Sequence, residues 1–258
     1  MKILLTNDDG INSEGIQKLA GALRSKGKYK VTVIAPEGNR SGISHAVSLL
    51  NGPVKLSRLD ADTFSCSGYP ADCVIAALLG ALTDKPDLLL SGINHGVNLG
   101  TDIIYSGTVA AARQASLAGI PAIALSLAGS AAFCWDMAAS WAADHLEELM
   151  AYCEKDTFVN VNIPNNPEGP DGIAVTYPAA KRYNDTLSVM NAPDGSLWCF
   201  LNSGEEAVVT DAGSDCAAVS RNLVSVSSVC NLPAIKRAPG AADAGVFAPA
   251  SCRGGEKG

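Results

Sequence analysis

Short apolar runs alternate with stretches of helical periodicity through the first half of the chain, and this alternation restricts the fold more than any other feature. Four runs are typical of buried strands: residues 2–5, 31–35, 87–90 and 120–127. Helical patterns cover residues 11–26, 72–83 and 108–117. Strands separated by helices run parallel, because each helix returns the chain to the same edge of the sheet. The sequence therefore predicts an α/β fold with a doubly wound, mostly parallel sheet.

The second half of the chain has a different pattern. Residues 137–153 carry large side chains at helical spacing, so we expect one helix that packs on the sheet. Four strand-like runs follow without long helices between them: residues 158–163, 173–177, 197–201 and 223–229. Turns rich in Asn, Pro and Gly separate some of these runs. This pattern predicts a C-terminal extension of antiparallel hairpins that enlarges the core or reaches a partner subunit.

We expect a single domain with an appendage, which the length of 258 residues allows. The domain is assigned to residues 1–237, with its core at about residues 1–165 and a hairpin extension for oligomerisation at about residues 166–237. Residues 238–258 are rich in Ala, Gly and Pro and have few large apolar side chains, so we expect a disordered tail there.

Charge and cysteine usage limit the partners and the compartment. The net charge of −7 argues against duplex nucleic acid or an anionic membrane, whereas a small phosphorylated substrate is compatible if a bound cation supplies positive charge. Residues 115–135 lack charge, but Gly and Pro interrupt them, so a buried strand is expected rather than a membrane span. The eight cysteines show no Cys-x-x-Cys spacing, and no secretory pattern opens the sequence. We therefore expect a cytoplasmic protein.

The residues that directly follow each predicted strand are the candidates for chemistry, because ligands of parallel sheets bind at the carboxyl ends of the strands. The first strand leads into Asp8 and Asp9, without the glycine-rich phosphate patterns of dinucleotide-binding or P-loop folds. These adjacent carboxylates repel each other unless a cation neutralises them, and hard oxygen ligands favour Mg²⁺ or Mn²⁺. One interpretation is a metal site. The other is that one Asp caps the next helix while its neighbour is solvated.

Further polar loops are expected at the same edge of the sheet. Residues 35–44 and 91–100 are rich in Gly, Ser and Asn, which lets backbone N–H groups approach an anion and side-chain oxygens approach a metal. Ser106, Gly107 and Thr108 open a helix, where they can bind phosphate or simply cap the helix. His45 and His95 lie in these loops and are equally consistent with proton transfer, phosphate orientation or a hydrogen-bonded loop role. Together the loops indicate a binding site.

These loops resemble those of the SurE family, the stationary-phase survival proteins that act as metal-dependent nucleoside monophosphate phosphatases. The matching motifs are Asn7-Asp8-Asp9-Gly10, Ala35-Pro36 with Ser41-Gly42-Ile43-Ser44, residues 68–74 (GYPADCV), residues 91–100 (SGINHGVNLG) running into residues 105–111 (YSGTVAA), Gly119-Ile120-Pro121 and residues 160–164 (NVNIP). Agreement is good over about residues 1–165 and thinner to about residue 230, and residues 91–111 form the most specific block. Three departures, at residues 114–115, 69 and 227–228, affect none of the expected metal ligands.

The resemblance implies a Rossmann-like core and a reaction class. The expected cofactor is one divalent metal ion per subunit, Mn²⁺ or Mg²⁺, held by Asp8, Asp9, Ser41 and Asn94. The substrate phosphate is expected at Asn98, Ser106, Gly107 and Thr108. The expected reaction is hydrolysis of nucleoside 5′-monophosphates, with 3′-nucleotides as a further option, and Asp8 or Asp9 orients or deprotonates the attacking water. The family also implies a homodimer or homotetramer in which C-terminal hairpins exchange between subunits.

Other classes of protein also place acidic residues after the first strand. A haloacid-dehalogenase-like phosphatase requires Asp-x-Asp, whereas Asp8 and Asp9 are adjacent. A signalling receiver domain requires a phosphate-accepting Asp at the end of a later strand, but residues 87–90 run into residues 91–94 without a carboxylate at that position. A broad-range phosphatase or exopolyphosphatase remains an alternative.

Overall fold

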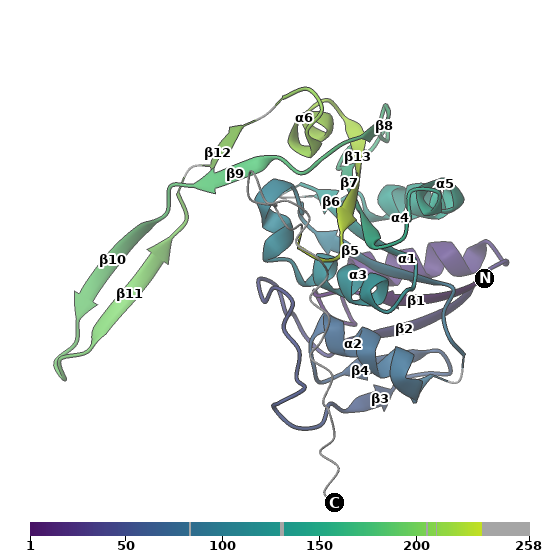
Figure 1. The fold of residues 1–258 in the computed structure, drawn as a ribbon, viewed down its shortest axis with the longest axis horizontal. Helices are drawn as coiled ribbons and strands as arrows, with labels where there is room; N and C mark the ends of the chain where they lie inside the picture. The colour runs from purple at the N-terminus through teal and green to yellow at the C-terminus, as the bar shows by residue number, and fades with distance from the viewer. Residues whose placement is uncertain (83, 130–131, 205, 210, 234–258) are drawn as a thin grey trace, which may run out of the picture.

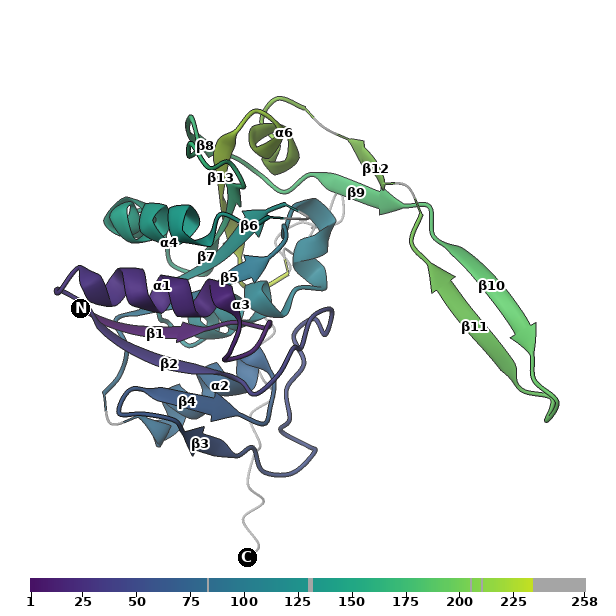
Figure 2. The same cartoon turned by 180° about the vertical axis from the view of Figure 1, so that it is seen from behind.

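The fold is built on a mixed sheet of nine strands (Figures 1 and 2). The computed structural model describes residues 1–82, 84–129, 132–204, 206–209 and 211–233, so the expected tail at residues 238–258 lies outside the described residues. The strand order is β3-β4-β2-β1-β5-β6-β7-β13-β8. The strands are β1 (Lys2–Thr6), β2 (Lys30–Pro36), β3 (Leu56–Arg58), β4 (Thr63–Cys66), β5 (Leu88–His95), β6 (Ala122–Ala128), β7 (Thr157–Pro164), β8 (Gly172–Val175) and β13 (Leu223–Cys230).

The central strands run parallel, as the sequence predicts. Strands β4, β2, β1, β5, β6 and β7 pair in parallel, while β3 pairs antiparallel with β4 and β13 antiparallel with β7. In β1, Ile3 and Leu5 belong to one core cluster and Leu4 belongs to the other. The sheet is therefore buried on both faces, which is why these strands are continuous apolar runs.

Helices cover both faces of the sheet. Helices α1 (Glu14–Ser25), α4 (Trp135–Asp144) and α5 (Leu146–Met150) pack on one face, and α2 (Pro70–Ala76) and α3 (Gly107–Leu117) on the other (Figure 1). A π-helical turn, η1 (Ala77–Ala81), extends α2, and a 3₁₀ turn, η2 (Gly100–Ile104), precedes α3. The predicted doubly wound α/β class is confirmed.

Some element boundaries differ from the prediction. The expected single helix at residues 137–153 is wrong, because α4 and α5 are separated at His145, whose Nδ1 lies 2.9 Å from the Trp141 carbonyl oxygen. The uncharged residues 115–135 contain the end of α3, all of β6 and the first residue of α4. Within the described part of the chain, no helix combines the length and apolar character needed to cross a bilayer.

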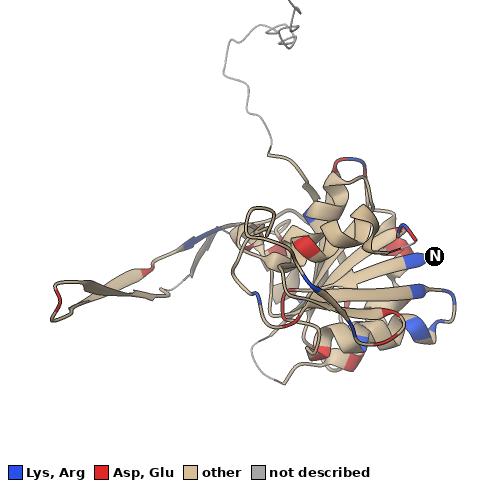
Figure 3. Ribbon diagram, turned by 90° about the horizontal axis from the view of Figure 1, so that it is seen from below, with Lys and Arg blue, Asp and Glu red and all other residues tan. Residues whose placement is uncertain are grey.

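The C-terminal extension contains the predicted antiparallel hairpin. Strands β10 (Thr186–Asn191) and β11 (Leu197–Asn202) form a long arm that projects away from the α/β body (Figures 1 and 2). At its base, β9 (Ala180–Tyr183) pairs with β12 (Glu206–Val209), and α6 (Asp215–Ser220) leads back into β13. Figure 3 shows Lys and Arg interspersed with Asp and Glu over the body rather than gathered on one basic face.

Candidate active site

Three segments meet at the carboxyl edge of the sheet, where the sequence predicts the chemistry. Asp8 follows β1, Asn94 lies in β5, and Thr108 stands in the first turn of α3. All three are buried, with exposed fractions of 3% for Asp8, 9% for Asn94 and 0% for Thr108. Strands β1 and β5 are neighbours in the sheet, so their ends deliver Asp8 and Asn94 to one place.

Direct contacts join these residues. The Thr108 hydroxyl donates a short hydrogen bond to the Asp8 carboxylate, and its Oγ1 lies 3.5 Å from Asn94 Oδ1. Gly107 allows the close approach, because a Cβ at this position would lie 2.8 Å from Asp8 Cβ. The start of α3 therefore packs against the end of β1 with no room for a side chain between them.

The electrostatic environment of the acidic pair is unfavourable without a cation. Burial, and then repulsion by Asp9, raises the pKa of Asp8 to about 6, although its hydrogen bond with Thr108 acts in the opposite direction. Burial also raises the pKa of Asp9, opposed by the His95 backbone N–H, which donates to Asp9 Oδ2 at 3.0 Å. None of the ion pairs formed by the described residues includes Asp8 or Asp9.

The donor set fits a hard divalent cation. The described residues contain no cluster of three or more His, Cys, Asp and Glu side chains that could hold a metal, so neutral oxygens would have to complete the site. Asp8, Ser41 and Asn94 line one hollow of about 300 Å³, whereas the fourth expected ligand, Asp9, lines the neighbouring hollow. Mg²⁺ commonly uses one or two carboxylates and keeps several waters, so the Asp8 carboxylate with amide and hydroxyl oxygens suits it.

Of the four expected phosphate-binding residues, Asn98 and Ser106 line the same hollow, whereas Gly107 and Thr108 are buried behind it. Ser106 Oγ accepts from the Val109 N–H at 3.1 Å, so Ser106 is the N-cap of α3, as one interpretation of the sequence proposed. Asn98 is held firmly: its Nδ2 donates to Ser126 Oγ at 2.8 Å, and its backbone N–H donates to Asn162 Oδ1 at 2.8 Å. Strands β6 and β7 thus position Asn98 beside the start of α3.

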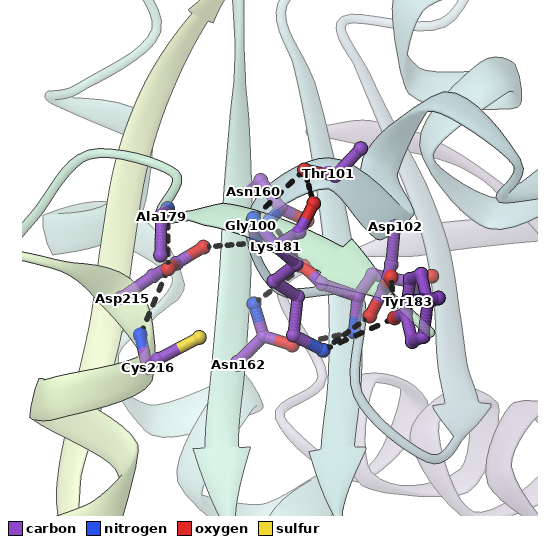
Figure 4. Close-up of polar contacts among 11 residues, drawn as sticks. Gly100, Thr101, Asp102, Asn160, Asn162, Ala179, Lys181, Tyr183, Asp215 and Cys216 are labelled. Atoms are coloured by element: carbon purple, nitrogen blue, oxygen red, sulfur yellow. Dashed lines mark hydrogen bonds and ion pairs between the residues drawn. The ribbon is translucent and has the colours of Figure 1, made fainter. Parts of the chain in front are cut away.

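A second group of residues at this hollow was not anticipated from the sequence (Figure 4). Lys181 of β9 forms an ion pair with Asp102 of η2 at 2.6 Å, and the Tyr183 hydroxyl also donates to Asp102. Asp215 of α6 accepts from the Gly100 N–H at 2.7 Å and from the Ala179 N–H at 2.9 Å. These contacts tie the loop after β5 to the base of the arm. No local pattern marks them, because the partners lie far apart in sequence.

The two loop histidines differ in position. His45 Nε2 lies 3.0 Å from Gln114 Oε1, so His45 has the hydrogen-bonded loop role that the sequence allowed. The His95 side chain is exposed, and its ring packs against Phe133 with 4.1 Å between centroids. His95 is therefore the histidine that borders the acidic pair.

Fold and site together define a Rossmann-like α/β protein with one buried and one half-buried carboxylate at the carboxyl edge of its sheet. The family model described as Survival protein SurE matches residues 3–185. The 5′-nucleotidase SurE of Thermoanaerobacter sp. (strain X514) is 39% identical over 238 residues, covering 89% of this chain and 92% of that protein. The 5′-nucleotidase SurE of Vibrio cholerae is 40% identical over 230 residues, covering 88% and 90%.

The solved structures agree with the sequence comparison. The crystal structure of the SurE protein from Aquifex aeolicus superposes with a TM-score of 0.79 at 36% identity, covering 90% of this chain and 94% of that one. This chain belongs to the SurE family. Family membership sets aside the haloacid-dehalogenase-like and receiver alternatives, as the spacing of Asp8 and Asp9 already indicated.

Proposed function

We propose that this protein is a metal-dependent phosphoric monoester hydrolase that converts nucleoside monophosphates into nucleoside and phosphate. The observation that carries the proposal is the Asp8 carboxylate, 3% exposed and beside Asp9, with no cationic side chain of the described residues paired to either. The curated name 5′-nucleotidase of its relatives supports the substrate class.

Each part of the site has a role in the proposed reaction. Bound at Asp8, Asp9, Ser41 and Asn94, a divalent cation supplies Lewis-acid stabilisation of the phosphoryl charge. The N–H groups at the start of α3, from Gly107 and Thr108, and the side chains of Asn98 and Ser106 hold the phosphate oxygens. One of the two aspartates accepts the proton of the attacking water.

The assembly is also part of the proposal. The arm exposes a set of large apolar side chains: Leu187, Val189, Met190, Leu197, Trp198, Phe200 and Leu201. An isolated two-stranded hairpin is marginally stable in water, so a second copy of the chain is the partner we propose, in a homodimer or homotetramer. Residues 1–237 would then act as one domain, with about residues 166–237 as its oligomerisation extension.

The described cysteines form no disulfide with one another, in keeping with the proposed cytoplasmic location.

Phosphate release tests the proposed activity. We expect turnover of nucleoside 5′-monophosphates with Mn²⁺ or Mg²⁺, loss of turnover in excess chelator, and recovery when metal is restored. The same assay with 3′-monophosphates and polyphosphate defines the range of substrates. Full activity in excess chelator, or no release from any nucleotide with either metal, would contradict the proposal.

A further inference from the structure

A second hollow, of about 510 Å³, lies beside Asp9 and adjoins the one that contains Asp8. His95 lines both hollows, so the two lie on either side of one residue. The second hollow is also lined by Phe133 and by Trp135, the first residue of α4. A ligand whose phosphate is bound near Asp8 can therefore extend past Asp9 toward two aromatic rings.

We propose that the ring cluster of His95, Phe133 and Trp135 is the nucleobase subsite of this enzyme. The inference rests on the proposed function, because it assigns a place to the base of the same substrate. The ring centroids of His95 and Phe133 are 4.1 Å apart, and those of Phe133 and Trp135 are 5.0 Å apart with 15° between the planes. Planar bases bind proteins chiefly by stacking on such rings.

The three rings differ in exposure, as expected of side chains that line a binding site. Trp135 is 8% exposed, Phe133 is half-buried and the His95 side chain is exposed, so the stack runs from the core to the solvent. The buried ring of Trp135 packs closely against Gly15 of α1, where a Cβ would lie 3.0 Å from Trp135 Cζ3. This ring is thus packed in place before a ligand arrives, which lowers the entropic cost of binding.

Polar groups line the same hollow as the rings. They are Ser13, Glu14 and Asn39, which supply a hydroxyl, a carboxylate and an amide. Apolar faces combined with a few polar groups are typical of small-molecule sites. The amino groups and ring nitrogens of a nucleobase match such donors and acceptors.

The rings of the first hollow are less suited to this role. Tyr183 donates its hydroxyl to Asp102 and is fixed in that network, and Tyr105 stacks on no other ring among the described residues. The only other ring pair in the described part of the chain, Trp141 with His145, borders neither hollow. The cluster beside Asp9 is therefore the stacking surface within reach of the proposed metal site.

Fluorescence tests binding of the base without metal or turnover. Trp135 is one of three tryptophans in the sequence, so the double variant Trp141→Phe/Trp198→Phe leaves it as the sole indole reporter. Adenosine is expected to quench its emission saturably, whereas ribose is not. Adding Phe133→Leu to this background should weaken adenosine binding about tenfold, within the range of a single base–aromatic stack. If adenosine causes no saturable quenching, the inference is overturned.

Kinetics test whether the subsite serves catalysis. The ratio of kcat/KM for adenosine 5′-monophosphate to that for ribose 5-phosphate should fall about tenfold in Phe133→Leu, mostly through KM, and be preserved in Phe133→Tyr. Trp141→Phe is the matched control and should leave the ratio as in the wild type. If Phe133→Leu does not fold, as judged by circular dichroism, His95→Ala takes its place, with the same expectation for adenosine binding.

The two proposals fail in different ways. Nucleotide hydrolysis with an unchanged ratio in Phe133→Leu would overturn the base subsite and leave the proposed function standing. Saturable quenching by adenosine without hydrolysis of any nucleotide would support the subsite and contradict the proposed function.

Discussion

At the scale of single residues, the burial of Asp8 favours the binding of a cation. A carboxylate loses its hydration when it is buried, and here only the Thr108 hydroxyl and local backbone groups compensate. The pKa of Asp8 is therefore raised to about 6. A bound cation would remove this cost. Without metal, the buried charge of Asp8 therefore lowers the free energy of unfolding at neutral pH.

The first prediction concerns stability without metal. Because the pKa of folded Asp8 is about 6 and the ordinary value is 3.8, the folded state binds more protons than the unfolded state between these pH values. The contribution of Asp8 to the free energy of unfolding should therefore fall by up to about 3 kcal/mol as pH rises through this window. Asp8→Asn should lack this fall. Urea unfolding of both proteins in chelator from pH 4 to 8 measures the difference, and identical pH profiles would refute the assignment.

The second prediction separates the proposed metal ligand from the proposed phosphate ligand. Asn94→Ala should weaken Mn²⁺ affinity, and its activity should recover partly at high Mn²⁺, because mass action offsets a loss of affinity. Asn98→Ala should keep the Mn²⁺ affinity and instead raise KM or lower kcat, without recovery at high metal. Calorimetric metal titration and steady-state kinetics on both variants provide the comparison. Unchanged metal affinity and kinetics per folded molecule in both would mean that these residues are only structural.

At the scale of elements, the arm and the active-site loop share an anchor. The ion pair of Lys181 with Asp102 and the bonds of Asp215 to Gly100 and Ala179 join β9 and α6 to the loop after β5. Lys181 is only 7% exposed, so this anchor is part of the packed body rather than a surface contact. The arm that begins at β9 is thus physically connected to the hollow that contains Asp8.

The third prediction is that the arm holds the assembly together. Leu187 and Leu201 pair across the hairpin with exposed fractions of 54% and 84%, so their side chains are available to a partner. Leu187→Ser/Leu201→Ser should shift the protein from oligomer to monomer in sedimentation velocity, because the apolar contact area is lost. Asp194→Ser at the hairpin tip is the matched control and should leave the oligomer intact. A monomeric wild type, or an oligomeric double variant, would show that the arm has another role.

At the scale of the whole molecule, the doubly wound sheet gathers groups from distant parts of the sequence. Two core clusters, one on each face, fix the positions of the strands, and the loops converge at the carboxyl edge. The site residues Asp8 and Thr108 are 100 positions apart, yet they share a hydrogen bond. The geometry of the site therefore depends on the packing of the whole core, and ligand binding should be coupled to global stability.

The fourth prediction uses this coupling. A metal that binds only the folded protein stabilises it by about 2.7 kcal/mol at a free concentration 100 times its Kd. Mn²⁺ should therefore raise the Tm of the wild type, and chelator should reverse the change. The control for screening of the net charge of −7 is Asp9→Asn, measured at the same ionic strength. Its Tm should rise little when Mn²⁺ is added. An equal increase in both proteins would indicate non-specific cation binding.

Local patterns in the sequence were sufficient to predict the parallel strands, the polar loops after them and a C-terminal extension of antiparallel strands, although β10 of the arm was not among the predicted strands. Burial on both faces makes the central strands continuous apolar runs, and a helix between strands requires parallel pairing. Short strands such as β3 and β4, with their partly exposed residues, escaped prediction because three or four residues carry too little periodicity. The break at His145 was also missed, since helical spacing continues across it.

Tertiary structure alone decided which distant groups meet. The hydrogen bond between Asp8 and Thr108, the ion pair between Lys181 and Asp102, and the ring contact of His95 with Phe133 each join segments that no local pattern connects. The raised pKa of Asp8 likewise results from burial, which is a property of the packed core and not of the sequence around the residue. Residue types and their periodicity determine which elements form, whereas distances, burial and electrostatic environment arise only when the sheet and its two helical layers are packed together.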